Sequence, residues 1–220
     1  MTRFVLRCGD VPVPITLASL STASAAPIPL DDEIDETLVP LDTDSAPRLI
    51  VLGRDAALAA VLTRLMRLER LDIEIAYVPV ERSAGSAIYR TGTGAAAAKR
   101  AVSGKATDVP LIRDDMGIVL VGKARIDGPD GDTLFGEGFV DDTKIFEGKA
   151  NSVHISPTGE FPGLRACAVR GQLRRLRWVP GRAAQVGAEG IVVTRDGVSS
   201  DRTVRRSTFY RHTEPWKLVR

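Results

Sequence analysis

The residues best suited to chemistry follow a short apolar run, in the order Gly53, Arg54, Asp55 and Ala56. A glycine at such a place lets several backbone N–H groups converge on the oxygen atoms of a phosphate, because it has no Cβ atom. A neighbouring carboxylate, here Asp55, could hold Mg²⁺, which binds phosphates together with one or two carboxylates. The spacing therefore predicts a phosphate-binding loop with Asp55 near a metal ion.

Three residues of this loop also have a second interpretation. Ala56 disfavours a positive φ and adds a methyl group where a phosphate would approach. Arg54 could bind a phosphate through two hydrogen bonds, or it could fill the nucleotide site and pair with an acidic neighbour. The filled site is favoured, since charge alone does not restore the loop geometry. Asp55 could simply cap the helix that follows.

Asp196 is the second candidate metal ligand, although Asp196-Gly197 is also typical of a hairpin turn. The spacing of other residues argues against several further chemistries. The sequence contains neither a Gly-x-x-x-x-Gly-Lys-Ser/Thr loop nor a Gly-x-Ser-x-Gly nucleophile elbow. Zinc is not expected, because His154 and His212 have no Cys or His partners at ligand spacing.

The elements that must position the loop alternate between strand and helix. Residues 48–53 are apolar and closed by glycine, which is typical of a buried parallel strand. The next segment has an apolar stripe at helical spacing, formed by Leu58, Val61, Leu62, Leu65 and Leu68. A β-branched run over 73–80 completes a strand–helix–strand unit, and helices are expected over 86–90 and 95–102. Near the N-terminus we expect short strands over 4–8 and 14–20, and an acidic surface loop with one helical turn over 27–47.

Beyond residue 110 the sequence consists of short β-rich runs separated by Gly, Pro and Asp turns. The expected strands are 118–121, 123–126, 152–155, 165–169, 174–179, 191–195 and 203–210. We therefore predict an α/β, Rossmann-like domain over 1–110 and an antiparallel β-sandwich domain over 111–220. The last strand could return to the first domain.

This order of elements resembles the superfamily that joins bacterial diacylglycerol kinases, sphingosine kinases and NAD kinases. That family carries a Gly-Gly-Asp-Gly-Thr loop after a strand, which Gly53 and Asp55 match and Arg54 and Ala56 do not. Its second landmark is Pro-x-Gly-Thr-x-Asn-Asp, of which Pro79 remains. Its third is an Asp-Gly-Glu turn, represented here by the Asp-Gly pair at 196–197. The family's opening Asn-Pro strand and glycine loop are not found in residues 1–47.

The resemblance implies a divergent lipid-kinase-like protein that binds a nucleotide or lipid between its two domains. An active enzyme would use ATP and Mg²⁺ and move the γ-phosphate to a lipid hydroxyl, with residues 53–56, Arg82 and Ser83 near the nucleotide. The alternative is a catalytically inactive scaffold or regulatory protein that retains the kinase fold. In that case Arg54 and residues 81–84 would fill the nucleotide position.

The charges of the 220 residues are unevenly placed: residues 165–220 hold 13 Lys and Arg against 4 Asp and Glu. This asymmetry favours an anionic partner such as a lipid or a phosphorylated small molecule, with peripheral contact to a membrane. Alternatively, the two halves of the chain attract each other. Arginines flank Trp178 and Tyr210, but they alternate on the expected strands, so nucleic acid is the weaker hypothesis. A homodimer is compatible with the sequence.

Two cysteines, Cys8 and Cys167, form no disulfide framework, which indicates a reducing compartment and therefore the cytoplasm. No window approaches the roughly 18 apolar residues of a membrane span. Residues 11–20 follow two arginines and resemble a signal peptide. Asp10 and the prolines at 12 and 14 argue against that interpretation.

Overall fold

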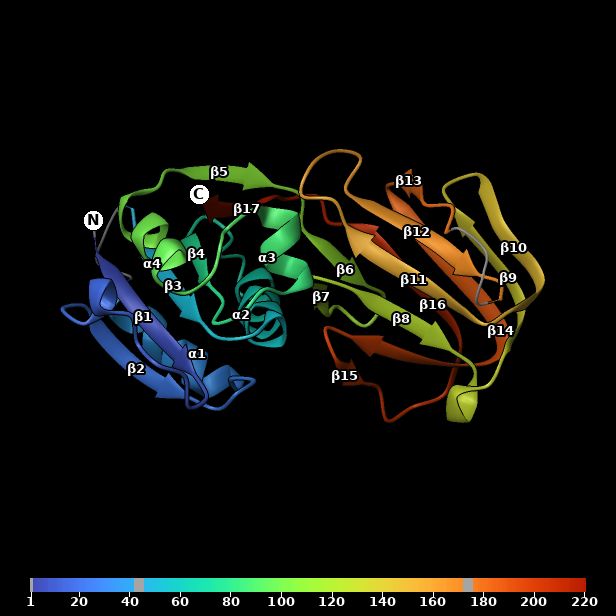
Figure 1. Cartoon of the computed structure of the whole chain (residues 1–220), viewed down its shortest axis with the longest axis horizontal. Coiled ribbons are helices and arrows are strands. Elements are labelled where there is room, and N and C mark those ends of the chain that lie inside the picture. Colours follow the sequence, from blue (N-terminus) through green and yellow to red (C-terminus); the bar gives the residue numbers. More distant parts are fainter. Residues whose placement is uncertain (1, 42–45, 172–175) are drawn as a thin grey trace. The chain divides into compact units, whose positions relative to one another are not determined.

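The computed structural model describes residues 2–41, 46–171 and 176–220. The chain forms two compact units, Met1–Val109 together with Glu214–Arg220, and Pro110–Thr213. The first unit contains helices and a sheet, and the second consists almost wholly of strands (Figure 1). An α/β domain and an antiparallel β domain are thus present, as the sequence predicts.

The first unit is built on one six-stranded sheet (Figure 1). Its strands are β1 (Arg3–Cys8), β2 (Ser21–Ala25), β3 (Arg48–Leu52), β4 (Glu74–Val78), β5 (Ala106–Val109) and β17 (Trp216–Val219). Its helices are α1 (Asp31–Leu38), α2 (Asp55–Arg67), α3 (Ala84–Tyr89) and α4 (Gly94–Ser103), with 3-10 turns over Ile15–Leu17 and Val39–Leu41. The strand order is β2-β1-β3-β4-β17-β5, with β5 antiparallel to β17 and the other neighbours parallel.

Both faces of this sheet are covered, which explains why every residue of β3 is buried. One face packs against α4 and the first 3-10 turn, through a core that includes Val5, Ile50 and Val78. Side chains alternate along a strand, so Tyr77 points to the opposite face, where it reaches the first residue of α2.

The second unit is an antiparallel β-sandwich. Its strands are β6 (Ile112–Asp114), β7 (Val119–Leu120), β8 (Ala124–Asp127), β9 (Leu134–Val140), β10 (Thr143–Ala150), β11 (Ser152–Pro157), β12 (Leu164–Val169), β13 (Val179–Gly181), β14 (Ala183–Arg195), β15 (Val198–Ser199) and β16 (Val204–Arg211). A 3-10 turn, Pro129–Gly131, joins β8 to β9. The 13-residue β14 links the layers, because residues 184–188 pair with β9 and residues 192–195 pair with β8. The inner faces of the two layers enclose one apolar core, with Ile126, Val186 and Phe209 among its residues.

Two expectations for the N-terminal segment were wrong. Residues 14–20 contain the 3-10 turn Ile15–Leu17 rather than a strand, and the strand β2 begins only at Ser21. The acidic segment contains the two-turn helix α1, which buries Ile34 and Leu38. Glu33 stabilises its start, because its carboxylate accepts hydrogen bonds from the backbone of Ala26 and Leu30.

The β half also differs from expectation, since β6 was not expected and β14 begins at Ala183 rather than at residue 191. Residues 176–178 belong to no strand, and the rest of the predicted strand 174–179 lies partly outside the described residues. The hairpin of β9 and β10 was not predicted, because glycines at 136, 138 and 148 and several charges hide its alternation.

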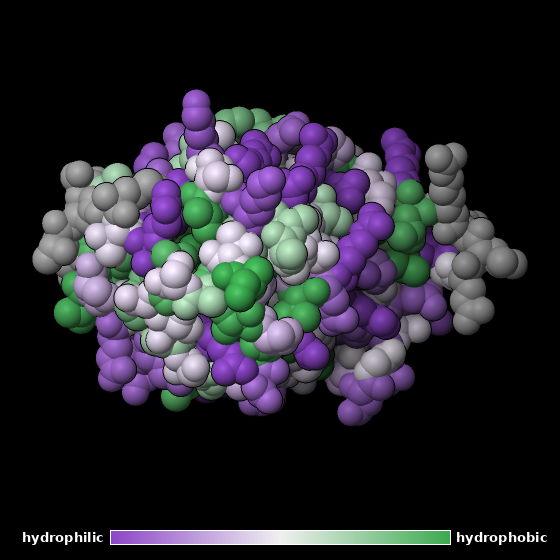
Figure 2. Space-filling model, turned by 60° about the vertical axis from the view of Figure 1, so that its left-hand side comes forward, coloured by the Kyte–Doolittle hydropathy of each residue, from purple (hydrophilic) through white to green (hydrophobic). Residues whose placement is uncertain are grey.

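Hydrophobic residues form small groups among hydrophilic ones on the face that Figure 2 shows. The most exposed large apolar side chains are those of Ile15 and Phe161, at 89% and 77%. Scattered exposure of this kind is ordinary for a protein surface. Within the described part of the chain, no helix is both long enough and apolar enough to cross a membrane.

Candidate functional site

The candidate site lies where the strand order of the first unit reverses direction. From β1 the chain passes to β2 on one side, and then through α1 to β3 on the other side of β1. Ligands of open α/β sheets bind outside the carboxyl ends of the strands at such a reversal. The loop that follows β3 is the predicted segment 53–56, so the topology and the sequence indicate the same place.

Gly53 is required there for close packing. A Cβ atom at this position would lie 2.9 Å from Cβ of Cys8 and 3.2 Å from Cβ of Ala57. Its backbone N–H donates a hydrogen bond to the carbonyl of Val78 at 3.3 Å. The N–H group of Gly53 therefore serves the junction of β1, β3 and β4, rather than pointing outward for a ligand.

The carboxylate of Asp55 accepts three hydrogen bonds. Its Oδ1 accepts from the hydroxyl groups of Tyr77 at 2.7 Å and Ser83 at 2.6 Å. Its Oδ2 accepts from the backbone N–H of Gly85 at 2.9 Å. These contacts join the start of α2 to β4 and to α3, so two of the predicted site residues, Asp55 and Ser83, are brought together.

One interpretation of the sequence was that Asp55 caps α2, and the structure contradicts it. Arg54 occupies the N-cap position with extended backbone, and its side chain makes no capping hydrogen bond. Ser83 is the residue with a capping role: its hydroxyl accepts a hydrogen bond from the backbone N–H of Ser86. The Asp55 carboxylate thus organises a neighbouring helix start rather than its own.

Arg54 and Arg82 carry the positive charge near this loop. Both side chains are exposed, and neither has an ion-pair partner in the part of the chain that the structure describes. They are free to meet an anion from solvent rather than buried within the fold. Ala56 lies half-buried in the first turn of α2, where backbone N–H groups have no carbonyl partner within the helix.

Asp196 lies in the second unit, at the tight turn between β14 and β15 that the sequence predicts. Its carboxylate accepts hydrogen bonds from three consecutive backbone N–H groups, those of Val121, Gly122 and Lys123, at 2.7–3.0 Å. It therefore anchors the chain between β7 and β8.

These contacts do not fit a carboxylate-held magnesium site well. A carboxylate offers about four lone-pair positions, and three hydrogen bonds occupy most of them in both Asp55 and Asp196. Among the described residues, no cluster of three or more His, Cys, Asp or Glu side chains has an arrangement that could hold a metal. The metal role of the two aspartates stays a prediction.

The predicted site residues did not include three further residues of this region: Tyr77, Gly85 and Cys8. A tyrosine inside a buried strand needs a partner for its hydroxyl, and that signal could have identified Tyr77. Burial raises the pKa of the Cys8 thiol to about 12, with the charge of Glu33 as a second cause. Cys8 is therefore a packing residue rather than a nucleophile.

A parallel α/β sheet that receives its last parallel strand after an antiparallel sandwich defines the fold class of diacylglycerol kinases and NAD kinases. The chain is similar to a diacylglycerol kinase from Bacillus anthracis str. Sterne, with a TM-score of 0.78 and 12% identity over 99% of this chain and 96% of that chain. It is also similar to an NAD kinase from Archaeoglobus fulgidus in complex with ATP, with a TM-score of 0.64 and 12% identity over 100% and 94% of the two chains. The resemblance inferred from sequence is thus confirmed for the fold.

A third similar structure is that of yeast NADH kinase complexed with NADH, with a TM-score of 0.59 and 9% identity over 100% of this chain and 83% of that chain. No family model matches the sequence, and neither does any curated protein.

Proposed function

We propose that this chain is a divergent diacylglycerol-kinase-like protein that binds the phosphate group of a nucleotide or a lipid at the start of α2. The observation that carries the proposal is the place of this 13-residue helix, which begins directly after β3 at the strand reversal. The N-terminus of a helix attracts anions through its free N–H groups and its dipole. The exposed guanidinium of Arg54 stands at that N-terminus and adds a donor with two parallel N–H groups.

The negative charge of Asp55 opposes an anion at the same helix end. Its carboxylate is turned toward Tyr77, Ser83 and Gly85, whose three hydrogen bonds offset part of that charge. Arg54 would supply most of the attraction, so the expected affinity is modest. The similar NAD kinase in complex with ATP supports a nucleotide as the first ligand to test.

A second candidate function is binding without phosphoryl transfer, in a protein that has kept the kinase fold. The contacts of Asp55 favour it, because a metal ion could gain the carboxylate only at the expense of existing hydrogen bonds. An active relative of the family would instead transfer phosphate from Mg-ATP to an alcohol group of a lipid.

Thermal unfolding with and without ligand tests the binding site. A ligand present at 100 times its dissociation constant adds about 2.7 kcal/mol of stability, which is several degrees for a chain of this size. We expect ATP, ADP or NAD at millimolar concentration to raise the Tm, and Arg54→Gln to abolish the rise. The matched control is Arg67→Gln, an exposed arginine at the opposite end of α2. Equal shifts in both variants, or no shift with any ligand including phosphatidate, would overturn the proposal.

A transfer assay separates the two candidate functions. Radiolabelled ATP is incubated with Mg²⁺ and diacylglycerol, sphingosine or NAD, using the wild type and Asp55→Asn. Turnover that disappears in a folded Asp55→Asn protein identifies a kinase. Nucleotide binding without turnover on any acceptor identifies the inactive form.

A further inference from the structure

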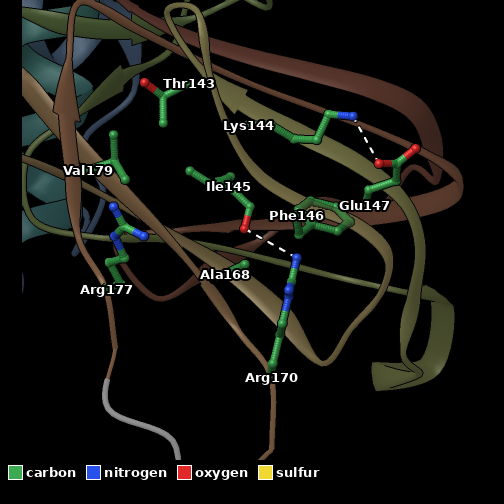
Figure 3. Close-up of a pocket in the computed structure, with 9 residues that line it drawn as sticks. All are labelled: Thr143, Lys144, Ile145, Phe146, Glu147, Ala168, Arg170, Arg177 and Val179. Atoms are coloured by element: carbon green, nitrogen blue, oxygen red, sulfur yellow. Dashed lines mark hydrogen bonds and ion pairs between the residues drawn. The ribbon is translucent and has the colours of Figure 1, made fainter.

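A cavity of about 600 Å³ lies wholly within the β-sandwich unit (Figure 3). It opens where the two layers of the sandwich end. Among the described strands, β10 pairs only with β9, and β13 pairs only with β12, so each is the last strand of its layer. The cavity is lined by Thr143, Lys144, Ile145, Phe146, Glu147, Ala168, Arg170, Arg177 and Val179.

Two arginines give this cavity a positive charge that the described residues do not neutralise. The guanidinium of Arg170 donates a hydrogen bond to the carbonyl of Ile145 at 3.4 Å, and that of Arg177 has no hydrogen-bond or ion-pair partner among the described residues. Figure 3 shows the guanidinium of Arg170 directed toward the carbonyl of Ile145. Arg170 follows β12 and Arg177 precedes β13, two strands that pair with each other. The third cation, Lys144, forms an ion pair with Glu147 at 2.9 Å and contributes little net charge.

The floor of the cavity is apolar and continuous with the core. Phe146 is 1% exposed, and Ile145, Ala168 and Val179 pack against the same core from partly buried positions. The cavity therefore has charged arginine side chains at its rim and apolar side chains at its floor.

A β-bulge produces this arrangement. The register of β10 with β9 shifts between Lys144 and Phe146, so Ile145 is the extra residue and its carbonyl meets Arg170. Gly138 opposite leaves room for the ring of Phe146, since a Cβ atom there would lie 2.5 Å from that ring. Both Ile145 and Phe146 are thereby fixed as parts of the floor.

We propose that this cavity binds a small amphipathic anion, namely an organic phosphate that carries a short apolar chain. Guanidinium groups bind phosphate through paired hydrogen bonds, and among the described residues no ion pair joins Arg170 or Arg177 to an acidic side chain. The apolar chain covers the floor formed by Ile145, Ala168 and Val179. The volume lies within the range of small-molecule sites. The site belongs to a different unit from the α2 site and does not depend on it.

Calorimetric titration with hexyl phosphate tests the assignment. We expect hexyl phosphate to bind on the order of tenfold more tightly than inorganic phosphate, because the apolar floor contributes only to the former. The double variant Arg170→Gln/Arg177→Gln should weaken hexyl phosphate binding by on the order of tenfold. Its matched control is Arg125→Gln, an exposed arginine of the same unit that pairs with Asp127 outside the cavity.

Titration of the double variant with ATP, measured in parallel, separates this site from the one at α2, because nucleotide binding at α2 should be unchanged in that variant. Equal affinity for hexyl phosphate and inorganic phosphate would overturn the amphipathic assignment. Binding that survives in the double variant would overturn the location. A different result would be that the wild type binds phosphatidate vesicles but not hexyl phosphate, and that the double variant loses the vesicle binding. That result would replace the proposal with one in which the two arginines bind a membrane surface.

Discussion

The hydroxyl group of Ser83 lies 2.6 Å from Oδ1 of Asp55, to which it donates a hydrogen bond across 28 positions of sequence. The same hydroxyl accepts a hydrogen bond from the backbone of Ser86 at 3.0 Å. One side chain thus joins the start of α2 to the start of α3. The loop that the sequence predicts as a phosphate site is held from within the protein, and this has consequences for stability as well as for binding.

Replacement of Asp55 by asparagine should destabilise the first unit. The amide would turn an N–H₂ group toward donors, leaving at least one of Tyr77, Ser83 or Gly85 without an acceptor, at a cost of about 1–3 kcal/mol. Urea unfolding, followed through the fluorescence of the buried Trp216, measures the change.

The control for this prediction is Asp72→Asn, since Asp72 is exposed and pairs with Arg70 at 3.5 Å. That variant should stay within about 0.5 kcal/mol of the wild type. If the two variants unfold at the same urea concentration, the three hydrogen bonds of Asp55 do not contribute to stability as inferred.

Gly53→Ala should also destabilise the protein, by about 1–3 kcal/mol, because the new methyl group would press on Cys8 and Ala57. The matched control is Gly187→Ala in β14, where the nearest atom to an added Cβ lies 3.9 Å away. We expect that variant to be neutral or slightly stabilising. Thermal unfolding of both variants tests this prediction. If the Tm of Gly53→Ala equals that of the wild type, the junction of β1, β3 and β4 can make room for the added methyl group.

Replacement of Arg48 should cause the largest loss of stability among these variants. Its side chain is 4% exposed, pairs with Glu74 at 2.7 Å, and donates to the carbonyls of Ala101 and Gly104 at the end of α4. Arg48→Met would leave these acceptors without a donor and should cost about 2–4 kcal/mol.

Arg64→Met is the comparison for Arg48, because Arg64 also pairs with a carboxylate but does so at the surface, with Asp35. Its loss should be clearly smaller than that of Arg48, because surface ion pairs contribute little. Similar losses in the two variants, measured by urea unfolding, would show that the buried network of Arg48 adds nothing beyond an exposed ion pair.

The contrast between Arg48 and the apolar stripe of α2 shows what the sequence could predict. Local periodicity was sufficient for β3, α2 and β4, because each of these elements repeats its burial pattern within a few residues. It could not identify Arg48 as buried, since its partners Ala101 and Gly104 come more than 50 positions later. The fold class follows from the first kind of information, and the stabilising contacts follow from the second.

The features of the candidate site were likewise predicted only in part. The position of residues 53–56 after a buried strand was predicted, because strand, glycine and helix are adjacent in sequence. The engagement of Asp55 by Tyr77 and Gly85 was not predicted, since it depends on how β4 and α3 pack beside α2. A sequence motif gives the position of a carboxylate along the chain. Whether that carboxylate is free to bind a ligand depends on neighbours that are distant in the sequence.

His154 should make the stability of the β-sandwich unit depend on pH. Burial, followed by the charges of Lys123 and Arg125, lowers its pKa from the usual 6.5 to about 4. The unfolded chain therefore binds a proton near pH 6.5 that the folded chain accepts only near pH 4. The stabilising effect of the neutral ring is complete above pH 6.5 and is lost progressively as the pH falls toward 4.

His154→Gln should remove this part of the pH dependence, because glutamine does not titrate. Urea midpoints measured at pH 7.0, 6.0, 5.0 and 4.5 give the difference between wild type and variant, which cancels the background from the carboxylates. We expect that difference to shrink as the pH is lowered. His212→Gln, the variant of the other histidine, keeps His154 and should retain the wild-type slope attributable to it. A difference for His154→Gln that stays constant from pH 7.0 to 4.5 would mean that the ring is not held neutral by its surroundings.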